Sequence, residues 1–274
     1  MADITVSLFL LALFVLISEV TRKIATKLLA KTDYGVYVVE TISTFQLCAC
    51  THELKLLGEV GRIEPQIGLT LTYLISVIHA LTFHGAIGNP SSAIEHFYCR
   101  RLTGKCVLAR IACQFVGAVL ARTMVPYVWA LGFSDLHMRH KLFGFKCINP
   151  INATLPKGAA VELSCAFVVQ TAVTHMYHVD EKYRAHAVAA VITALVYAGG
   201  SVTGAVFNPA LAYSTQFSCS GHTFAEYSFV YWLGPVLGVA TSLLLFDKII
   251  PILSGKSSYQ NNLNVPYFET KKLI

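Results

Sequence analysis

Two asparagine–proline pairs are the residues of this sequence best suited to act on a ligand: Asn89-Pro90-Ser91 and Asn208-Pro209-Ala210. Asparagine is a strong helix cap and proline fits the first helical position, so each tripeptide predicts a helix start. An asparagine amide can also donate a hydrogen bond to a neutral solute. The chemistry that these residues offer is therefore reversible hydrogen bonding, with no covalent step.

Each pair follows an apolar segment, residues 68–83 in the first case and 185–198 in the second. A helix that begins at membrane depth must be buried in protein or line a water-filled cavity, because lipid satisfies no backbone polar group. Interrupted segments at corresponding places in two halves indicate a central transport site built from half-helices. This setting predicts a pore, whereas the pair Asn149-Pro150 lies in a polar loop and carries no such meaning.

The two halves repeat at three anchors, whose offsets are 122, 119 and 117 residues: Glu40 and Phe45 with Glu162 and Phe167, Asn89 with Asn208, and Val116-Gly117 with Leu233-Gly234. An internal repeat constrains the architecture more than any local pattern does, so it is considered first. Each half contains three spans, so the second half starts on the opposite side of the membrane and is inverted.

Three stretches carry a family resemblance: residues 44–48 (Thr-Phe-Gln-Leu-Cys), 50–54 (Cys-Thr-His-Glu-Leu) and 197–211, which ends in Phe-Asn-Pro-Ala-Leu. Through them the chain resembles the aquaporin (major intrinsic protein) family over roughly residues 38–250, and most of all its super-aquaporin, aquaporin-eleven-type branch. The resemblance implies an all-α integral membrane protein. Its fold would be a right-handed bundle of six spans in two inverted repeats, with two re-entrant half-helices.

The resemblance also assigns roles to single residues. The pore motif would consist of Asn89, Pro90, Ser91, Asn208, Pro209 and Ala210, and the half-helix supports would be Glu40 and Glu162, which accept backbone hydrogen bonds. Cys219 matches a cysteine of the branch, and is expected to brace the second half-helix or serve assembly, with a buried inert thiol as the alternative.

The filter positions depart from the water-selective pattern. Leu211 stands where typical aquaporins have an arginine, and Val196 where a histidine often lies. Both changes remove polar donors, so the constriction should be less polar and wider. Glycerol and hydrogen peroxide therefore join water as candidate permeants.

Composition fits a membrane protein: of 274 residues, 55% are hydrophobic and 13% charged, and the mean hydropathy is +0.58. The net charge of +6 is spread over short loops, which indicates topology signals and argues against a nucleic-acid partner. Most of the eight cysteines fall in apolar spans, and disulfides stay open. Cys48, Cys50 and His52 do not share one helix face, so neither a metal nor another cofactor is predicted.

The chain divides into an N-terminal hydrophobic helix and basic cytoplasmic segment (1–35), a channel domain (36–250) and a cytoplasmic tail (251–274). The channel domain contains repeats at about 36–130 and 156–250. The apolar run at residues 4–18 precedes a basic cluster, which favours an extra membrane helix with its amino end in the lumen; an interfacial helix is the alternative. The core spans are expected at 36–57, 68–83, 106–129, 158–177, 185–198 and 227–250.

Arg110 and Arg122 within one span should snorkel toward its ends. With this layout, 13 of the 21 lysines and arginines lie on the cytoplasmic side, in agreement with the positive-inside rule.

Two short signals bear on location. Lys271 and Lys272 resemble the dilysine retrieval signal of endoplasmic-reticulum membrane proteins, which a retrieval coat reads on a cytoplasmic carboxyl end. Asn152 begins an Asn-Ala-Thr acceptor pattern for glycosylation on the predicted luminal side, although the next span is near.

The sequence thus predicts a passive channel for water and small neutral solutes in intracellular membranes, embedded in lipid and, by resemblance alone, homotetrameric. A pore-less scaffold and a solute transporter of the same fold are the alternatives, the latter needing ionisable groups at the midplane. An intramembrane enzyme would need a nucleophile and a base, and nothing brings Ser201 and His186 together.

Overall fold

The computed structural model describes residues 2–61, 63–176 and 178–254, and the regular secondary structure of this part consists of helices and one isolated bridge between Ile148 and Ser220. The all-α prediction is confirmed. Lys271 and Lys272 lie outside the described residues. The elements are α1 (Ala2–Leu28), α2 (Gly35–Glu59), α3 (Pro65–Thr82), α4 (Pro90–Tyr98), α5 (Gly104–Ala130), α6 (Asp135–Leu142), α7 (Leu155–His175), α8 (Glu181–Thr203), α9 (Pro209–Thr215), α10 (Phe224–Ser228), the π-helix η1 (Phe229–Leu233), α11 (Gly234–Leu244), the π-helix η2 (Leu245–Ile249) and α12 (Ile250–Leu253).

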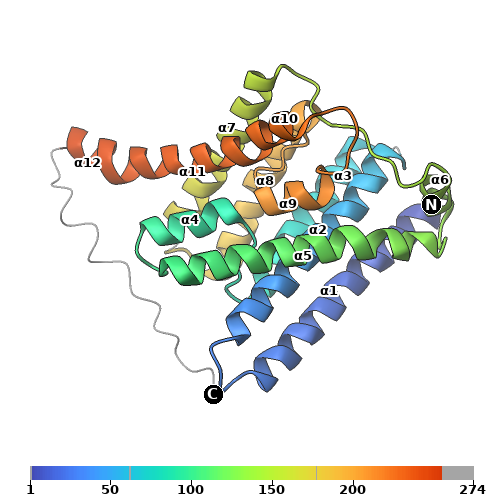
Figure 1. Cartoon of the computed structure of the whole chain (residues 1–274), viewed down its shortest axis with the longest axis horizontal. Helices are drawn as coiled ribbons and strands as arrows, with labels where there is room; N and C mark the ends of the chain where they lie inside the picture. Colours follow the sequence, from blue (N-terminus) through green and yellow to red (C-terminus); the bar gives the residue numbers. More distant parts are fainter. Residues whose placement is uncertain (1, 62, 177, 255–274) are drawn as a thin grey trace.

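The bundle has two ends, which we name by the helices found there. The α6 side, at the right of Figure 1, holds α6 and the amino end of α1, whereas the α4 side, at the left, holds α4 and α12. Helix α5 runs from one side to the other, and the short helices α4 and α9 both pack against it.

Five helices of the described residues are long and apolar enough to cross a membrane: α1, α3, α5, α8 and the continuous helix Phe224–Leu253. The polar residues of α2 and α7, Glu40 and Glu162 among them, lower the hydropathy of these two helices, which are also long. Together these segments account for the six expected core spans and the extra N-terminal helix.

Glycines bring the first and third helix of each half into close contact. A Cβ atom on Gly117 of α5 would lie 2.5 Å from the carbonyl oxygen of Thr41 on α2, and a Cβ atom on Gly238 of α11 would lie 2.3 Å from that of Leu163 on α7. No larger side chain fits at these crossings, as small residues at membrane helix contacts allow backbones to approach. Gly117 and Gly238 therefore occupy corresponding positions in the two halves, whereas the predicted counterpart, Gly234, lies one helical turn away and packs against Ala159 and Glu162.

Two predicted boundaries were wrong. Helix α8 continues from the apolar run through Gly199 and Gly200 to Thr203. Gly199 is needed for packing against α7, since a Cβ atom there would lie 2.9 Å from the Val161 side chain. The turn into the half-helix therefore begins at Gly204, whose φ of 86° favours glycine. The connection 130–157 also contains a helix, α6, capped by the Ser134 hydroxyl, which accepts from the backbone N–H of His137.

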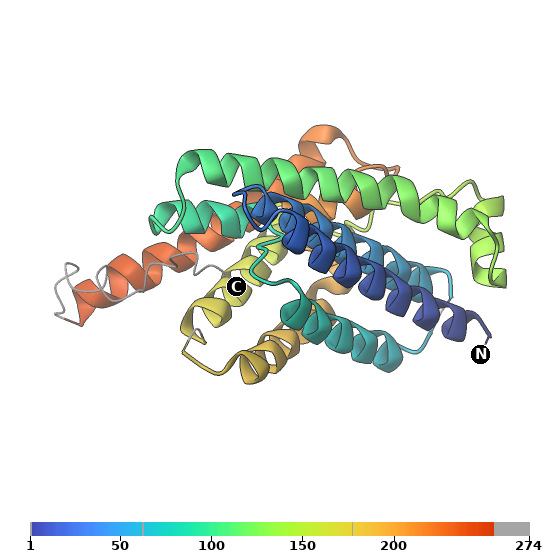
Figure 2. The same cartoon turned by 90° about the horizontal axis from the view of Figure 1, so that it is seen from below.

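Helix α1 is longer than its apolar run and packs against α2; in the view of Figure 2 it crosses the bundle between α5 and α3. Arg22, predicted to lie in a basic segment beside the core, is instead fully buried in this contact. The face of α2 that meets α1 is buried along its length and carries three polar residues beside two apolar ones: Ser43, Gln46, Glu53, Cys50 and Leu57 are each 0% exposed. The extra helix is thus an integral part of the fold.

Candidate functional site

The two half-helices meet through their amino ends, because the cap residues Asn89 and Asn208 contact each other's loops. The Asn208 amide nitrogen donates to the carbonyl of Gly88 at 2.8 Å, and the Asn89 amide nitrogen donates to the carbonyl of Phe207 at 3.2 Å. The contact is reciprocal across the repeat.

Each asparagine also caps its own half-helix. The Asn89 side-chain oxygen accepts from the backbone N–H of Ser91 at 3.0 Å, and the Asn208 oxygen accepts from those of Ala210 and Leu211 at 3.0 and 3.3 Å. A primary amide carries two N–H donors. In the part of the chain described, the cross-loop contact uses one N–H of each amide, so the other can serve a solute.

A buried carboxylate supports the first re-entrant loop. Glu40 is 0% exposed and accepts from the backbone N–H groups of Ile87 and Gly88, the latter at 2.7 Å. Gln114 of α5 donates to it at 2.8 Å, and Arg110 of α5 forms an ion pair with it at 2.7 Å. Arg110, expected to snorkel, is instead the counter-ion of Glu40.

Glu162 supports the second loop without a cation among the described residues. It accepts from the backbone N–H groups of Val206, at 3.1 Å, and Phe207, and from the hydroxyl of Thr203. The Thr203 carbonyl in turn accepts from the hydroxyl of Tyr231, which is fully buried in the π-helix η1, at 2.6 Å. A π-helical turn within a helix often lies at a functional site. Here the π-helix η1 carries Tyr231, whose hydroxyl bonds the last residue of α8.

The loops hold backbone conformations that side chains rarely adopt. In the first loop His84 has φ 48° and Gly88 φ 63°, and in the second Ala205 has φ 46° and Phe207 φ 38°. Such conformations persist when the surroundings over-determine them, which is what the Glu40 and Glu162 hydrogen bonds do. Gly88 and Phe207 are also the residues whose carbonyls accept the asparagine amides.

The remaining pore-motif and filter residues lie as follows. Ser91 is 1% exposed, and its hydroxyl has no hydrogen-bond partner in the described part of the chain. Leu211 packs against both apolar clusters of the core. Val196 lies half-buried on α8, outside both clusters.

Cys219 is not a free thiol, because it forms a disulfide with Cys147 of the connection between α6 and α7. The alternative of an inert buried thiol is therefore wrong. Sequence reasoning had no signal for the pairing, since the two residues are 72 positions apart in polar segments. Asn152 is exposed, and the side-chain nitrogen that would carry a glycan donates to the carbonyl of Ser201 at 3.1 Å.

Basic side chains from two other helices gather at the outer end of α9, a feature that the sequence did not suggest. Lys55 of α2 donates to the carbonyl of Thr215 at 3.1 Å and to the side chain of Gln216 at 2.7 Å. The Arg122 guanidinium lies over the rings of Tyr213 and Phe217, at 5.5 and 5.1 Å from their centroids, and so does not snorkel. A cation stabilises the carboxyl end of a helix, and Lys55 occupies that position on α9.

A third fully buried carboxylate, Glu53, connects the helices of the α6 side. It accepts from the hydroxyl of Ser7, from the indole nitrogen of Trp129 at 2.7 Å, and from His137 at 3.2 Å. His140 of α6 packs edge-on against Trp129. Burial lowers the pKa of His140, and the nearby His137 adds to this effect. His140 therefore packs there as a neutral ring at physiological pH.

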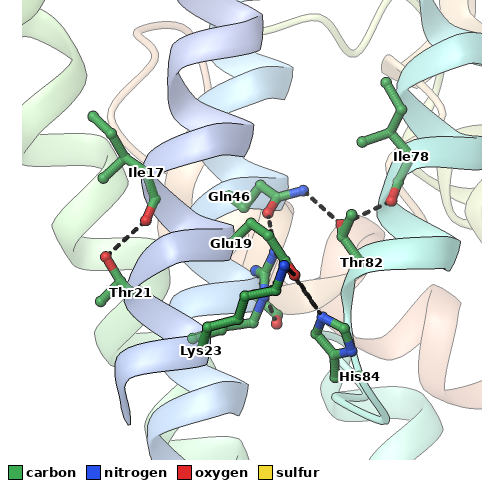
Figure 3. A network of polar contacts seen from close by, with 10 residues as sticks. Ile17, Glu19, Thr21, Lys23, Gln46, Ile78, Thr82 and His84 are labelled. Carbon is green, nitrogen blue, oxygen red and sulfur yellow. Dashed lines mark hydrogen bonds and ion pairs between the residues drawn. The ribbon is translucent and has the colours of Figure 1, made fainter. Parts of the chain in front are cut away.

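A charged network joins α1 to the first loop on the α4 side (Figure 3). Arg22 donates to the Gln46 side chain at 2.8 Å and pairs with Glu19 at 3.0 Å. The Gln46 amide donates to the hydroxyl of Thr82 at 3.2 Å, and Glu19 meets His84, the first strained residue of the loop, at 3.0 Å. The extra helix thus contacts the segment that leads to Asn89.

The structure separates the two residues that were considered for an intramembrane enzyme. Ser201 and His186 lie near opposite ends of α8, about 22 Å apart by helical rise. His186 instead pairs with the hydroxyl of Tyr73 on α3 at 2.7 Å. No nucleophile and base are brought together by this pair.

Comparison with known proteins gives concordant matches. The family model described as "Major intrinsic protein" matches residues 56–246. Human aquaporin-11 is 39% identical over 251 residues, which are 92% of each chain, and human putative aquaporin-12A is 34% identical over 265 residues, 96% of this chain and 87% of the relative. The structure of the aquaglyceroporin from Plasmodium falciparum shares the fold with a TM-score of 0.61 at 18% identity, covering 80% of this chain and 99% of that one.

The family match covers more than half of the chain, and the relatives match over nearly all of it. Members of this family are channels and not enzymes, so the chain is a multi-pass membrane channel for water or small solutes. The geometry at Asn89 and Asn208 and the comparisons agree: the chain belongs to the major intrinsic protein (aquaporin) family, in the branch of aquaporin-11 and aquaporin-12.

Proposed function

We propose that this chain is a passive channel that conducts water, glycerol and hydrogen peroxide across an intracellular membrane, with Asn89 and Asn208 as the central donors. The observation that carries the proposal is the reciprocal contact of these two amides, which fixes both at the meeting point of the half-helices. Each half-helix contributes a positive dipole end there, equivalent to about half an elementary charge. Cations are repelled at this meeting point, whereas a neutral solute accepts hydrogen bonds from the free N–H groups of the two amides.

Leu211 and Val196 support the wider choice of solutes. A leucine and a valine at the filter offer neither a donor nor a cation, so they hold back larger neutral molecules less than a polar constriction does. Water, glycerol and hydrogen peroxide all accept a hydrogen bond from an amide, and all follow a concentration or osmotic gradient without coupling.

The test is stopped-flow light scattering on proteoliposomes that hold the purified chain, with each solute assayed separately beside Asn208→Asp. The substitution removes the donor and places a carboxylate at the meeting point, so solute flux should fall about tenfold or more, as expected for a lost hydrogen bond of about 1.4 kcal/mol or more. Asn149→Asp is the matched control, since Asn149 also precedes a proline and caps its own turn, but in a loop.

Flux above that of empty vesicles, lowered by Asn208→Asp to the extent given above and kept by Asn149→Asp, would support the channel. Absence of flux for all three solutes in folded protein would favour the pore-less scaffold. Flux that depends on a co-transported ion would favour a transporter.

The proposed site of action is the endoplasmic-reticulum membrane, with the carboxyl end in the cytoplasm. Support comes from Lys271 and Lys272, whose positions match a dilysine signal for a retrieval coat. Replacing both with serine should move the protein from the reticulum to the cell surface, as seen by surface labelling. An unchanged distribution would refute retrieval by this signal.

Homotetrameric assembly, with one pore in each subunit, is proposed from the family alone. Native mass spectrometry of the detergent-extracted chain distinguishes a tetramer from a monomer or dimer.

A further inference from the structure

The two cysteines of the disulfide on the α6 side are not equally exposed. Cys219 is 5% exposed and lies directly beyond α9. Cys147 is half-buried in the loop after α6, between the exposed residues Lys146 and Ile148. A thiol that approaches from solvent therefore reaches Cys147 first.

A lysine stands beside the sulfur of the less exposed cysteine. The Lys55 ammonium lies 3.8 Å from the Cys219 sulfur, where the carbonyl of Thr215 and the side chain of Gln216 hold it. Glu59, the acidic residue that pairs with Lys55 at 3.8 Å, is half-exposed. A neighbouring ammonium stabilises a thiolate, so of the two sulfurs Cys219 is the better leaving group.

We propose that Cys147–Cys219 is a thiol-exchange and modification site for a small peptide thiol of the glutathione class, with its direction set by Lys55. The incoming thiolate attacks the Cys147 sulfur and forms a mixed disulfide with it. The Cys147–Cys219 bond breaks, and its electron pair leaves on Cys219 as a thiolate beside the ammonium. A second thiolate completes the reduction by attacking the peptide's sulfur in the mixed disulfide, which releases Cys147 as a thiolate and the oxidised peptide.

Backbone hydrogen bonds keep the two segments together during the exchange. The N–H of Ser220 donates to the carbonyl of Cys147 at 3.0 Å, and the N–H of Asn149 donates to the carbonyl of Ser220 at 2.9 Å. Cys219 therefore stays close to the modified Cys147 and can attack it in reverse, which expels the peptide thiol and restores the original bond. Modification of this site is reversible.

The test on the unaltered chain is chemical mapping. The full chain in detergent is incubated with reduced glutathione for set times, quenched with acid, alkylated and analysed by peptide mass spectrometry. Early samples should contain glutathione on Cys147 and the alkyl group on Cys219. Glutathione on Cys219, or equal amounts on both, would overturn the proposed direction.

The part played by the lysine is tested by the rate of the first step. Lys55→Met should slow the first step by about threefold or more, because the departing Cys219 thiolate loses the ammonium that lies 3.8 Å from its sulfur, and Lys55→Arg should restore the rate. Lys141→Met is the matched control, because Lys141 donates to the carbonyl of Ala130 on the same side of the bundle and is exposed. An unchanged rate in Lys55→Met refutes the role of Lys55, and the mapping on the unaltered chain decides the direction even if that variant does not fold.

Discussion

Replacement of Arg110 by methionine should destabilise the protein by about 3–5 kcal/mol, the cost of leaving a buried carboxylate without its counter-ion. Glu40 is fully buried, and Arg110 is its ion-pair partner at 2.7 Å. The backbone N–H groups of the loop and Gln114 would still donate to Glu40, but none of them carries a charge. Thermal unfolding in detergent, followed by size exclusion, measures the loss.

Two further variants separate the effect of the lost charge from the effect of lost packing. Glu40→Gln combined with Arg110→Met should be more stable than Arg110→Met alone, because the double variant buries no unpaired charge. Arg122→Met, on the same helix, removes only contacts with aromatic rings and should cost about 0.5–2 kcal/mol. If Arg110→Met and Arg122→Met cost the same, or if the double variant is the least stable, Glu40 does not depend on Arg110 for its charge balance.

Replacement of Arg22 by methionine should undock helix α1. Arg22 is fully buried, and its loss leaves the Gln46 oxygen and the Ser43 hydroxyl facing an apolar side chain. Each unsatisfied buried group costs about 1–3 kcal/mol, so the two together should cost about 2–6 kcal/mol. Trypsin cleavage at Lys31, in the connection between α1 and α2, should become faster, and the thermal midpoint should fall.

Lys23→Met is the control for this variant, because Lys23 pairs with the same carboxylate, Glu19, at 3.3 Å while its side chain is 72% exposed. An exposed ion pair contributes about 0–1 kcal/mol. Equal effects of Arg22→Met and Lys23→Met would show that the network in Figure 3 is a surface feature and does not hold the helix.

The sequence predicted the parts of this fold that depend on local signals. The helix starts at Asn89 and Asn208 were predicted from capping, and the apolar spans from hydropathy. Alignment of the halves found the repeat but placed the counterpart of Gly117 at Gly234, one helical turn from Gly238. These signals are encoded within a few residues, so a single sequence suffices to read them.

Features that join distant segments could not be read in the same way. Arg110 lies 70 residues from Glu40, and Lys55 lies 160 residues from Thr215, so nothing local marks them as partners. Both were basic residues in or near apolar helices, for which snorkelling or a loop position is the simplest expectation. The Cys147–Cys219 disulfide and the burial of Arg22 depend in the same way on tertiary packing.

The distribution of polar groups along α2 has a consequence for how the chain is made. Glu40 finds its cation on α5, Gln46 finds its donor on α1, and Glu53 finds partners on α1, α5 and α6. A ribosome delivers α2 to the membrane after α1 and before α5. When α2 reaches the translocon, only part of its polar surface has a partner. The polar segments of α2 therefore gain their remaining partners only after α5 and α6 have been synthesised. The order in which the helices are made thus differs from the order in which they are stabilised.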